Sequence, residues 1–379
     1  MDLSLSRKQQ ELICRVKDLM QNEISPCLFN VHDPEVFDWS LVEKLAAHNL
    51  VCPIVPKEFG GLGLDHFTTA MIMEEIAAGH PGLAAVVAAT LHAAEPIILA
   101  GTQQQKELFL PTLTGKKAGM ASFAMTEPRG GSDLTNMQTF AQKKGMAFLI
   151  TGTKDYIINA PVASFISLIA TTDHSKGKAA IRVFIVPGDL PGLKIGKKHQ
   201  TAGLNYAAIA EVIFDNARIY ETNVIKQGEA GSGYLLVNET FDRGRAMVAA
   251  ISVGIARRAM EAAIEFAEDR EQFGTRIKNH QAVAFTLADM ATEIEMARLL
   301  YWKASWLIDK GGDYSTTSSM AKLASSHIAQ RVTCEASDIM GARAYEKGSL
   351  LEQLVRDARV LSTIEGTSNI NRLLIASQL

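Results

Sequence analysis

One carboxylate, Glu365, stands among apolar and hydroxyl-bearing side chains in the segment "LSTIEGTSNINRLLIASQL", residues 361–379. A carboxylate shielded from water can act as a general base and remove a proton from a weakly acidic carbon. The residue also has an ordinary explanation, because an acidic side chain near a helix start is stabilised by exposed backbone N–H groups. Thr367 and Ser368 are typical helix caps, and apolar residues follow them at helical spacing. The segment by itself leaves both interpretations open.

A glycine-rich stretch, "SFAMTEPRGGSD" at residues 122–133, supplies a second set of candidate residues. Glycine accepts backbone angles that other residues resist, so Gly130 and Gly131 would let the chain turn N–H groups toward a phosphate-bearing ligand. The neighbouring Ser132 and Asp133 are polar. The alternative is an exposed turn that joins two domains, because glycine-rich turns are common. This motif is weak evidence when it is taken alone.

Two further stretches combine aromatic and polar residues. In "ITGTKDYIINAP", residues 150–161, Tyr156 could stack on a flat ring, although an aromatic residue in a strand more often belongs to the core. In "EDREQFGTRIKNHQ", residues 268–281, Arg270 could pair with a pyrophosphate through two hydrogen bonds. The ordinary explanation of that stretch is a charged helix end with a glycine cap.

The elements that must position these residues change in type along the chain. Residues 1–118 are predicted to form a helical domain, because stretches such as "DWSLVEKLAAHNL" and "HFTTAMIMEEIAAGH" carry apolar residues at helical spacing. Residues 119–228 contain β-branched or alternating runs ("AFLITG", "SFISLIATT", "AIRVFIV", "LKIG", "AEVIFDNARI"), which predict a β domain. Residues 229–379 return to long amphipathic helices after a glycine-rich linker, "KQGEAGSGY". Strands and helices do not alternate as in a Rossmann domain, so any dinucleotide would be bound in another way.

The composition excludes several classes of protein. A chain of 379 residues with 47% hydrophobic and 21% charged residues is typical of a folded multidomain protein. Its formal net charge of −3 gives no sign of a nucleic-acid interface, which needs a clustered basic face. The four cysteines are far apart and form no CxxC pair, so we expect neither a metal site nor a disulfide framework, and we expect a reducing compartment.

The chain is not expected to span a membrane. The most apolar stretch, "PGLAAVVAATLHAAEPIILAG", is interrupted by His92, Glu95 and Pro96, which favours a buried helix. The first residues, "MDLSLSRKQQELICRVKDLM", resemble an amphipathic helix and lack the apolar core of a signal peptide. We therefore expect a cytoplasmic protein, or a mitochondrial-matrix protein if a transit peptide precedes this sequence.

Taken together, the motifs resemble the acyl-CoA dehydrogenase family over nearly the whole chain. The resemblance lies in five stretches in the same order: "TEPRGGSD" at 126–133, "GTKDYIIN" at 152–159, "REQFG" at 270–274, "RDAR" at 356–359 and "EGTS" at 365–368. Each stretch is common by itself, whereas all five in this order are specific.

The resemblance implies an N-terminal all-α domain, a middle β-sandwich or barrel domain and a C-terminal four-helix bundle. FAD would lie between the β domain and the bundle, partly contacted by a neighbouring subunit, and no metal is implied. The residues implied for the cofactor are Phe123, Met125, Thr126, Ser132, Tyr156, Ile158, Arg270, Gln281, Asp338, Gly341 and Thr367. Those implied for the substrate are Ser132, Asp242, Arg245 and Gly366.

The reaction that the resemblance implies is the α,β-dehydrogenation of an acyl thioester. The α hydrogens of a thioester are weakly acidic and the β hydrogens are not, so a carboxylate must take the α proton while flavin N5 accepts the β hydride. Glu365 matches the position of the base. Some relatives carry the base on a bundle helix, at the position of Gly244, and glycine cannot perform that role.

Five positions depart from the family's common pattern. Arg129 replaces a small residue, Ile158 replaces a hydroxyl-bearing residue, and Ile364 replaces an aromatic residue before the base. Asp338 and Ala342 replace a glutamine and a glycine in the segment that meets the neighbouring subunit's FAD. These changes concern cofactor affinity and substrate choice.

Three functions remain open at this point. The chain could oxidise an acyl-CoA, it could act on an acyl group bound to an acyl carrier protein, or it could be an inactive FAD-binding or structural subunit. For the active enzyme we expect a short or medium acyl group and an electron-transfer flavoprotein as the acceptor. We also expect a homotetramer, because two long amphipathic helices near the C-terminus carry more apolar surface than one bundle needs.

Overall fold

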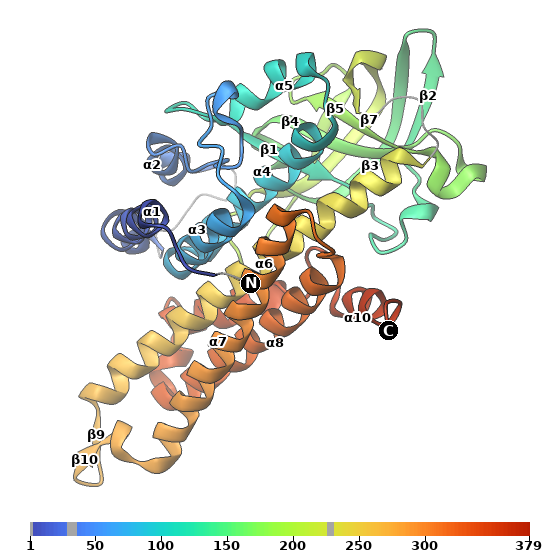
Figure 1. Ribbon diagram of the computed structural model, residues 1–379. Coiled ribbons are helices and arrows are strands. Elements are labelled where there is room, and N and C mark those ends of the chain that lie inside the picture. The colour runs from blue at the N-terminus through green and yellow to red at the C-terminus, as the bar shows by residue number, and fades with distance from the viewer. Residues whose placement is uncertain (1–2, 29–35, 226–230) are drawn as a thin grey trace.

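The computed structural model describes residues 3–28, 36–225 and 231–379, and it has three parts (Figure 1). Helices form the N-terminal part, a β-sheet forms the middle part, and a long helical bundle forms the C-terminal part. This arrangement confirms the predicted fold class. The predicted glycine-rich linker overlaps residues 226–230, which lie outside the described residues.

The N-terminal helices begin at the capping residues that the sequence offers. Ser6 and Gln9 form a capping box at the first helix, and the Asp65 side chain accepts a hydrogen bond of 2.7 Å from the backbone N–H of Thr68 at the third. Pro81 opens the fourth helix, at a position where a missing N–H has no cost. The helices are α1 (Arg7–Leu19), α2 (Ser40–Ala47), α3 (His66–Gly79), α4 (Pro81–Ala100) and α5 (Gln103–Phe109).

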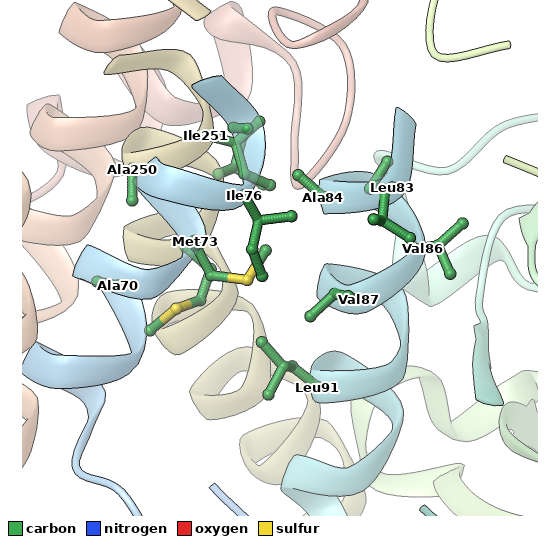
Figure 2. Close-up of a cluster of buried hydrophobic side chains, with 14 of the residues drawn as sticks. Ala70, Met73, Ile76, Leu83, Ala84, Val86, Val87, Leu91, Ala250 and Ile251 are labelled. Atoms are coloured by element: carbon green, nitrogen blue, oxygen red, sulfur yellow. The ribbon is translucent and has the colours of Figure 1, made fainter. Parts of the chain in front are cut away.

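Helix α4 is the apolar stretch that the sequence singles out. By length and hydropathy it is the single helix in the described ranges that could cross a membrane, yet 72% of its most apolar window is buried inside the protein. It packs on α3 and on α6 (Ser232–Asp269), and Figure 2 shows the shared core, which includes Met73 and Ile76 of α3, Val87 of α4 and Ile251 of α6. The predicted buried helix is confirmed.

The middle part is an eight-stranded sheet with the strand order β6-β7-β3-β2-β4-β5-β8, and β1 pairs in parallel with β4. Most neighbouring strands are antiparallel. The strands are β1 (Met120–Ala124), β2 (Phe140–Lys144), β3 (Ala147–Ile158), β4 (Ala163–Thr171), β5 (Ile181–Pro187), β6 (Leu193–His199), β7 (Ile209–Tyr220) and β8 (Val224–Ile225). The five predicted strand segments are confirmed as β3 to β7, whereas β1, β2 and the two-residue β8 were not predicted.

The three long C-terminal helices, α6, α7 and α8, pack lengthwise against one another (Figure 1). A short hairpin of β9 (Glu271–Gln272) and β10 (Thr275–Arg276) joins the first two at the far tip of the bundle. The helices are α6 (Ser232–Asp269), α7 (Gln281–Lys310), α8 (Ser315–Met340), α9 (Leu350–Val360) and α10 (Ser368–Ala376).

A buried carboxylate fastens the first part to the third. Glu74 of α3 accepts hydrogen bonds from Arg257 of α6 at 3.0 Å, and from Arg298 and Tyr301 of α7 at 2.9 and 2.6 Å. These charge-assisted contacts leave no carboxylate oxygen without a donor, which is what a buried charge requires. The relative position of α3 and the bundle, and with it the position of α4, is therefore fixed by specific polar contacts as well as by the core.

Candidate active site

A cavity of about 1210 Å³ lies where α4, the sheet, α6 and the segment before α10 meet. Its wall contains small alanines of α4, aromatic and branched apolar side chains, and a few hydroxyl, cationic and carboxylate groups. A large cavity with apolar walls and a few polar groups is typical of a site for an organic ligand.

The cavity brings together most of the residues that the sequence nominated, although they come from four separate segments. They are Phe123, Met125, Thr126, Ser132, Tyr156, Ile158, Arg245, Glu365, Gly366 and Thr367. Asp242 does not line the cavity, but its carboxylate pairs with the guanidinium of Arg245 one helical turn away.

Besides Asp242, four nominated residues do not line the cavity of this chain. Arg270 is exposed beside the β9–β10 hairpin and Gln281 is exposed at the start of α7, at the far tip of the bundle (Figure 1). Asp338 and Gly341 lie at the C-terminal end of α8. Phe273, in the hairpin, is 96% exposed. The length of the bundle separates the hairpin from the cavity, so Arg270 and Gln281 cannot contact a ligand there from the same chain.

The base candidate is held in an unusual backbone conformation. Glu365 has φ of 52° and Gly366 has φ of 86°, so two successive residues adopt left-handed angles between α9 and α10. Such angles are rare for a residue with a side chain and they concentrate at functional sites. Thr367 caps α10 by accepting a hydrogen bond of 3.3 Å from the backbone N–H of Ile370. The Glu365 carboxylate is therefore not used as the helix cap, which removes the ordinary explanation of its position.

His92 of α4 contacts this carboxylate, and no motif in the sequence identified it. Its Nδ1 lies 3.2 Å from Glu365 Oε1. A Cβ atom added to Gly244 of α6 would lie 2.5 Å from His92 Nδ1 and 3.1 Å from Glu365 Oε2, so glycine at this position makes room for both side chains. The signal that could have found His92 is its polarity in an otherwise apolar helix.

Two buried cations face the carboxylate from the bundle. Lys322 of α8 donates a hydrogen bond of 2.7 Å from Nζ to the carbonyl of Gly366, which holds the turn in place. Burial lowers the pKa of Lys322 to about 8, although the charge of Glu365 opposes that change. Burial also lowers the pKa of Arg245, against the opposing effects of Asp242 and Glu365. Lys322, like His92, was not recognised from the sequence.

A further group of buried charges lies behind His92, on α3, α4, α6 and α7. His66 Nε2 contacts Glu95 Oε1 at 2.6 Å, and His66 Nδ1 contacts Asp309 Oδ1 at 3.2 Å. Arg243 approaches Glu95 at 4.0 Å. Burial alone would lower the pKa of His66, but Glu95 and Asp309 outweigh it and raise the pKa to about 9. His66 is therefore a buried cation between two carboxylates at neutral pH.

The sheet presents Tyr156 to the cavity through a local irregularity. The pairing of β3 with β7 shifts register between Lys154 and Ile157, and Tyr156 has φ of 56°. A bulge of this kind re-aims a side chain. The Tyr156 ring is stacked on His199 with centroids 4.2 Å apart, and its side chain stays exposed to the cavity. The prediction that Tyr156 offers a flat face for a ring stays open, whereas a core position is excluded.

The loop "TEPRGGSD" is held by a buried ion pair at its base. Glu127 accepts hydrogen bonds from the backbone N–H groups of Gln138 and Thr139 at 2.7 and 2.8 Å, and from Lys154 at 2.9 Å. The glutamate therefore fixes the loop, and Thr126 and Ser132 reach the cavity. Of the departures from the common pattern, Ile158 and Ile364 line the cavity, whereas Arg129 and Ala342 are exposed and do not.

These features define a class of protein. A carboxylate without a capping role lies in a large apolar cavity together with hydroxyls, a stacking surface and buried cations, which suits proton abstraction from an organic substrate beside a flat cofactor. Among the described residues, no group of three or more acidic, cysteine or histidine side chains is arranged to hold a metal ion.

Comparison with known families agrees with this class. The acyl-CoA dehydrogenase N-terminal, middle and C-terminal domain families match residues 6–117, 122–217 and 231–379. The mitochondrial short-chain specific acyl-CoA dehydrogenase of Bos taurus is 36% identical over 380 residues, which cover 100% of this chain and 91% of the relative.

Solved structures give the same result. Butyryl-CoA dehydrogenase from Megasphaera elsdenii superposes with a TM-score of 0.95 at 31% identity, over 100% of this chain and 99% of the other. The prolyl acyl carrier protein oxidase AnaB superposes with a TM-score of 0.93 at 30% identity, over 99% of each chain. The chain belongs to the acyl-CoA dehydrogenase family, and it is an FAD-dependent flavoprotein enzyme.

The cavity fits part of FAD. Gly131 lines it close to Thr126, and an added Cβ atom would make a tight contact of 3.0 Å with Thr126 Oγ1, which favours glycine there. Hydroxyl groups of Thr126 and Ser132, beside the exposed face of Tyr156, offer hydrogen bonds and a stacking surface to the flat ring system of a flavin. The arginine suited to the pyrophosphate, Arg270, lies outside the cavity.

Proposed function

We propose that this protein catalyses the α,β-dehydrogenation of an acyl thioester, with Glu365 as the general base. The observation that carries the proposal is the position of the Glu365 carboxylate. It lies in the cavity, in a turn with left-handed backbone angles, and Thr367, not Glu365, caps the following helix α10. A carboxylate that lies in such a cavity and does not cap a helix is suited to removing a proton from carbon.

In the proposed mechanism the protein's own groups orient and deprotonate the thioester. Glu365 removes the α proton, and its backbone N–H would donate to the thioester oxygen as that oxygen gains negative charge. Bound FAD supplies the acceptor for the β hydride. Arg245, paired with Asp242, and Lys322, bonded to the Gly366 carbonyl, hold positive charge near the carboxylate.

For the substrate, we propose a short or medium acyl group. Ala85, Ala88 and Ala89 leave depth along α4, whereas Ile158 and Ile364 add branched, poorly adaptable bulk. Coenzyme A is the first choice of carrier, in line with the bovine and Megasphaera relatives. An acyl carrier protein is the alternative, favoured by the likeness to AnaB. A panel of acyl thioesters on both carriers would decide, and a highest kcat/KM on a long chain would exclude the short-chain proposal.

For assembly and electron transfer, we propose a homotetramer that passes electrons to an electron-transfer flavoprotein, in the cytoplasm or the mitochondrial matrix. A second copy would place Arg270, Gln281, Asp338 and Gly341 on the outer part of the cofactor, which one chain cannot do. The exposed Phe273 and Phe285 support an interface in this region. Light scattering that gives a monomer with full FAD content would exclude the shared site.

The decisive test of the function is the substitution Glu365→Gln, which keeps shape and polarity but removes the base. We expect turnover to fall by roughly two to four orders of magnitude, the usual contribution of general-base catalysis, with FAD content unchanged. Near-normal flavin reduction by the variant would place the base elsewhere. Loss of FAD together with activity would return Glu365 to a structural role. A purified protein that is colourless and cannot be reconstituted with FAD would favour the inactive-subunit hypothesis.

A further inference from the structure

The feature that the proposed mechanism leaves unused is the histidine in contact with the base. His92 lines the cavity, is only 4% exposed, and places Nδ1 3.2 Å from Glu365 Oε1. Its ring is packed edge-on between two aromatic rings, with centroid distances of 4.3 Å to Phe123 and 5.1 Å to Phe241. Because these rings fix its orientation, the contact with Glu365 is a built part of the site and not a chance approach of two mobile side chains.

We propose that His92 is a positioning residue for the base: its Nδ1–H donates to Glu365 Oε1 and leaves Oε2 as the atom that accepts the α proton. The inference rests on the proposed function. In the step itself the substrate's Cα–H bond breaks, the proton goes to Oε2, and the electron pair stays on the substrate as the enolate. His92 keeps its own proton throughout.

The surroundings of the second oxygen support this division of roles. Glu365 Oε2 is buried and has no hydrogen-bond partner in the described part of the chain. Gly244 leaves room beside both groups, because a Cβ atom at this position would lie 2.5 Å from His92 Nδ1 and 3.1 Å from Glu365 Oε2. An oxygen that is desolvated and free of donors is the more basic of the two, whereas the oxygen that accepts an N–H bond is stabilised as an anion.

Charged groups face the pair from three helices. Arg245 of α6 and Lys322 of α8 already face the carboxylate, and Asp242 balances Arg245. On the histidine's own helix, Glu95 acts on His92 and is itself paired with His66.

Two substitutions distinguish the role of the N–H donor from the role of the ring's packing. His92→Leu replaces the imidazole ring with an apolar side chain of similar size and removes the N–H donor. His92→Asn places an amide N–H near the position of Nδ1 and cannot become a cation. We expect the leucine variant to lose about ten- to a hundredfold in the rate of flavin reduction, the range set by a hydrogen bond to a charged group, and the asparagine variant to recover most of that loss.

The pH dependence gives a readout that a structural role would not move. Without the N–H donor the carboxylate is less stabilised as an anion, so the acid limb of kcat/KM should move to higher pH in His92→Leu and return toward the wild-type position in His92→Asn. A 3-ketoacyl thioester offers a second readout, because its α hydrogens are acidic enough for its enolate to be followed by absorbance. The holoenzyme's enolate formation should shift with pH in the same order.

Each outcome decides the inference. Acid limbs that coincide in all three proteins would overturn it, even if the variants lose FAD or thermal stability. An asparagine variant displaced as far as the leucine variant would show that an N–H donor at this position does not restore the base, and would also overturn the inference. Failure of the proposed function is recognised separately, because only then does Glu365→Gln keep normal flavin reduction.

Discussion

The substitution Gly244→Ala should damage catalysis far more than folding. The added Cβ atom would lie 2.5 Å from His92 Nδ1, 2.8 Å from His92 Cε1 and 3.1 Å from Glu365 Oε2. The His92 ring has little room to move away from the added atom, because Phe123 and Phe241 pack against it. The carboxylate must therefore move, and a displacement of about 1 Å at a reacting group costs on the order of a hundredfold in rate.

The cost to stability is expected to be small. Overpacking of this kind destabilises by about 1–3 kcal/mol, and replacing glycine by alanine inside a helix returns about 1 kcal/mol. The net loss in the free energy of unfolding should thus stay below about 2 kcal/mol.

A matched control lies on the same helix. At Gly254 an added Cβ atom would overlap the backbone oxygen of Glu74, far from the carboxylate, so Gly254→Ala should lower stability and leave the flavin reduction rate of the folded protein near wild type. Stopped-flow flavin reduction and chemical denaturation measure the two effects. Wild-type flavin reduction in Gly244→Ala would refute the packing of His92 and Glu365 against this glycine.

Two further predictions concern the buried charges that hold the parts together. Glu74→Gln should lower the free energy of unfolding by about 3 kcal/mol, because Arg257 and Arg298 lose a buried partner. The control Glu295→Gln breaks an exposed pair with Arg298 and should lower it by less than about 1 kcal/mol. Equal losses for the two variants in urea denaturation would contradict this prediction. His66 has its pKa raised to about 9, so its stabilising contribution is complete below its unfolded pKa, about 6.5, and is lost as the pH rises to 9. The stability difference between wild type and His66→Gln should shrink over that interval, and a difference that grows would contradict the assignment.

The sequence was sufficient for the order of domains because long helices and β-branched strands leave clear periodicity. Strands β1 and β2 were not predicted because their sequences, "MASFA" and "FAQKK", are rich in small or charged residues. They form strands because β1 pairs with β4 and β2 with β3, not because of local preference. The bulge that exposes Tyr156 has no local signal either, because it arises from the register of β3 against β7.

The candidate site was predictable where a motif carries it and not where packing creates it. Glu365 follows from its motif, and its turn follows from Gly366 and Thr367. His92 and Lys322 reach the same turn from α4 and α8, and only the tertiary arrangement brings those helices to it. The polar interruption of α4 by His92 and Glu95 was visible in the sequence, but it identified neither partner.

The most direct test of the proposed reaction is anaerobic mixing of the purified protein with a saturated short-chain acyl thioester, with the flavin absorbance and the thioester product followed together. The proposal predicts bleaching of bound FAD and formation of the 2-enoyl thioester in equal amounts. A protein that contains FAD and yet shows neither bleaching nor enoyl product with any thioester of the panel would contradict it.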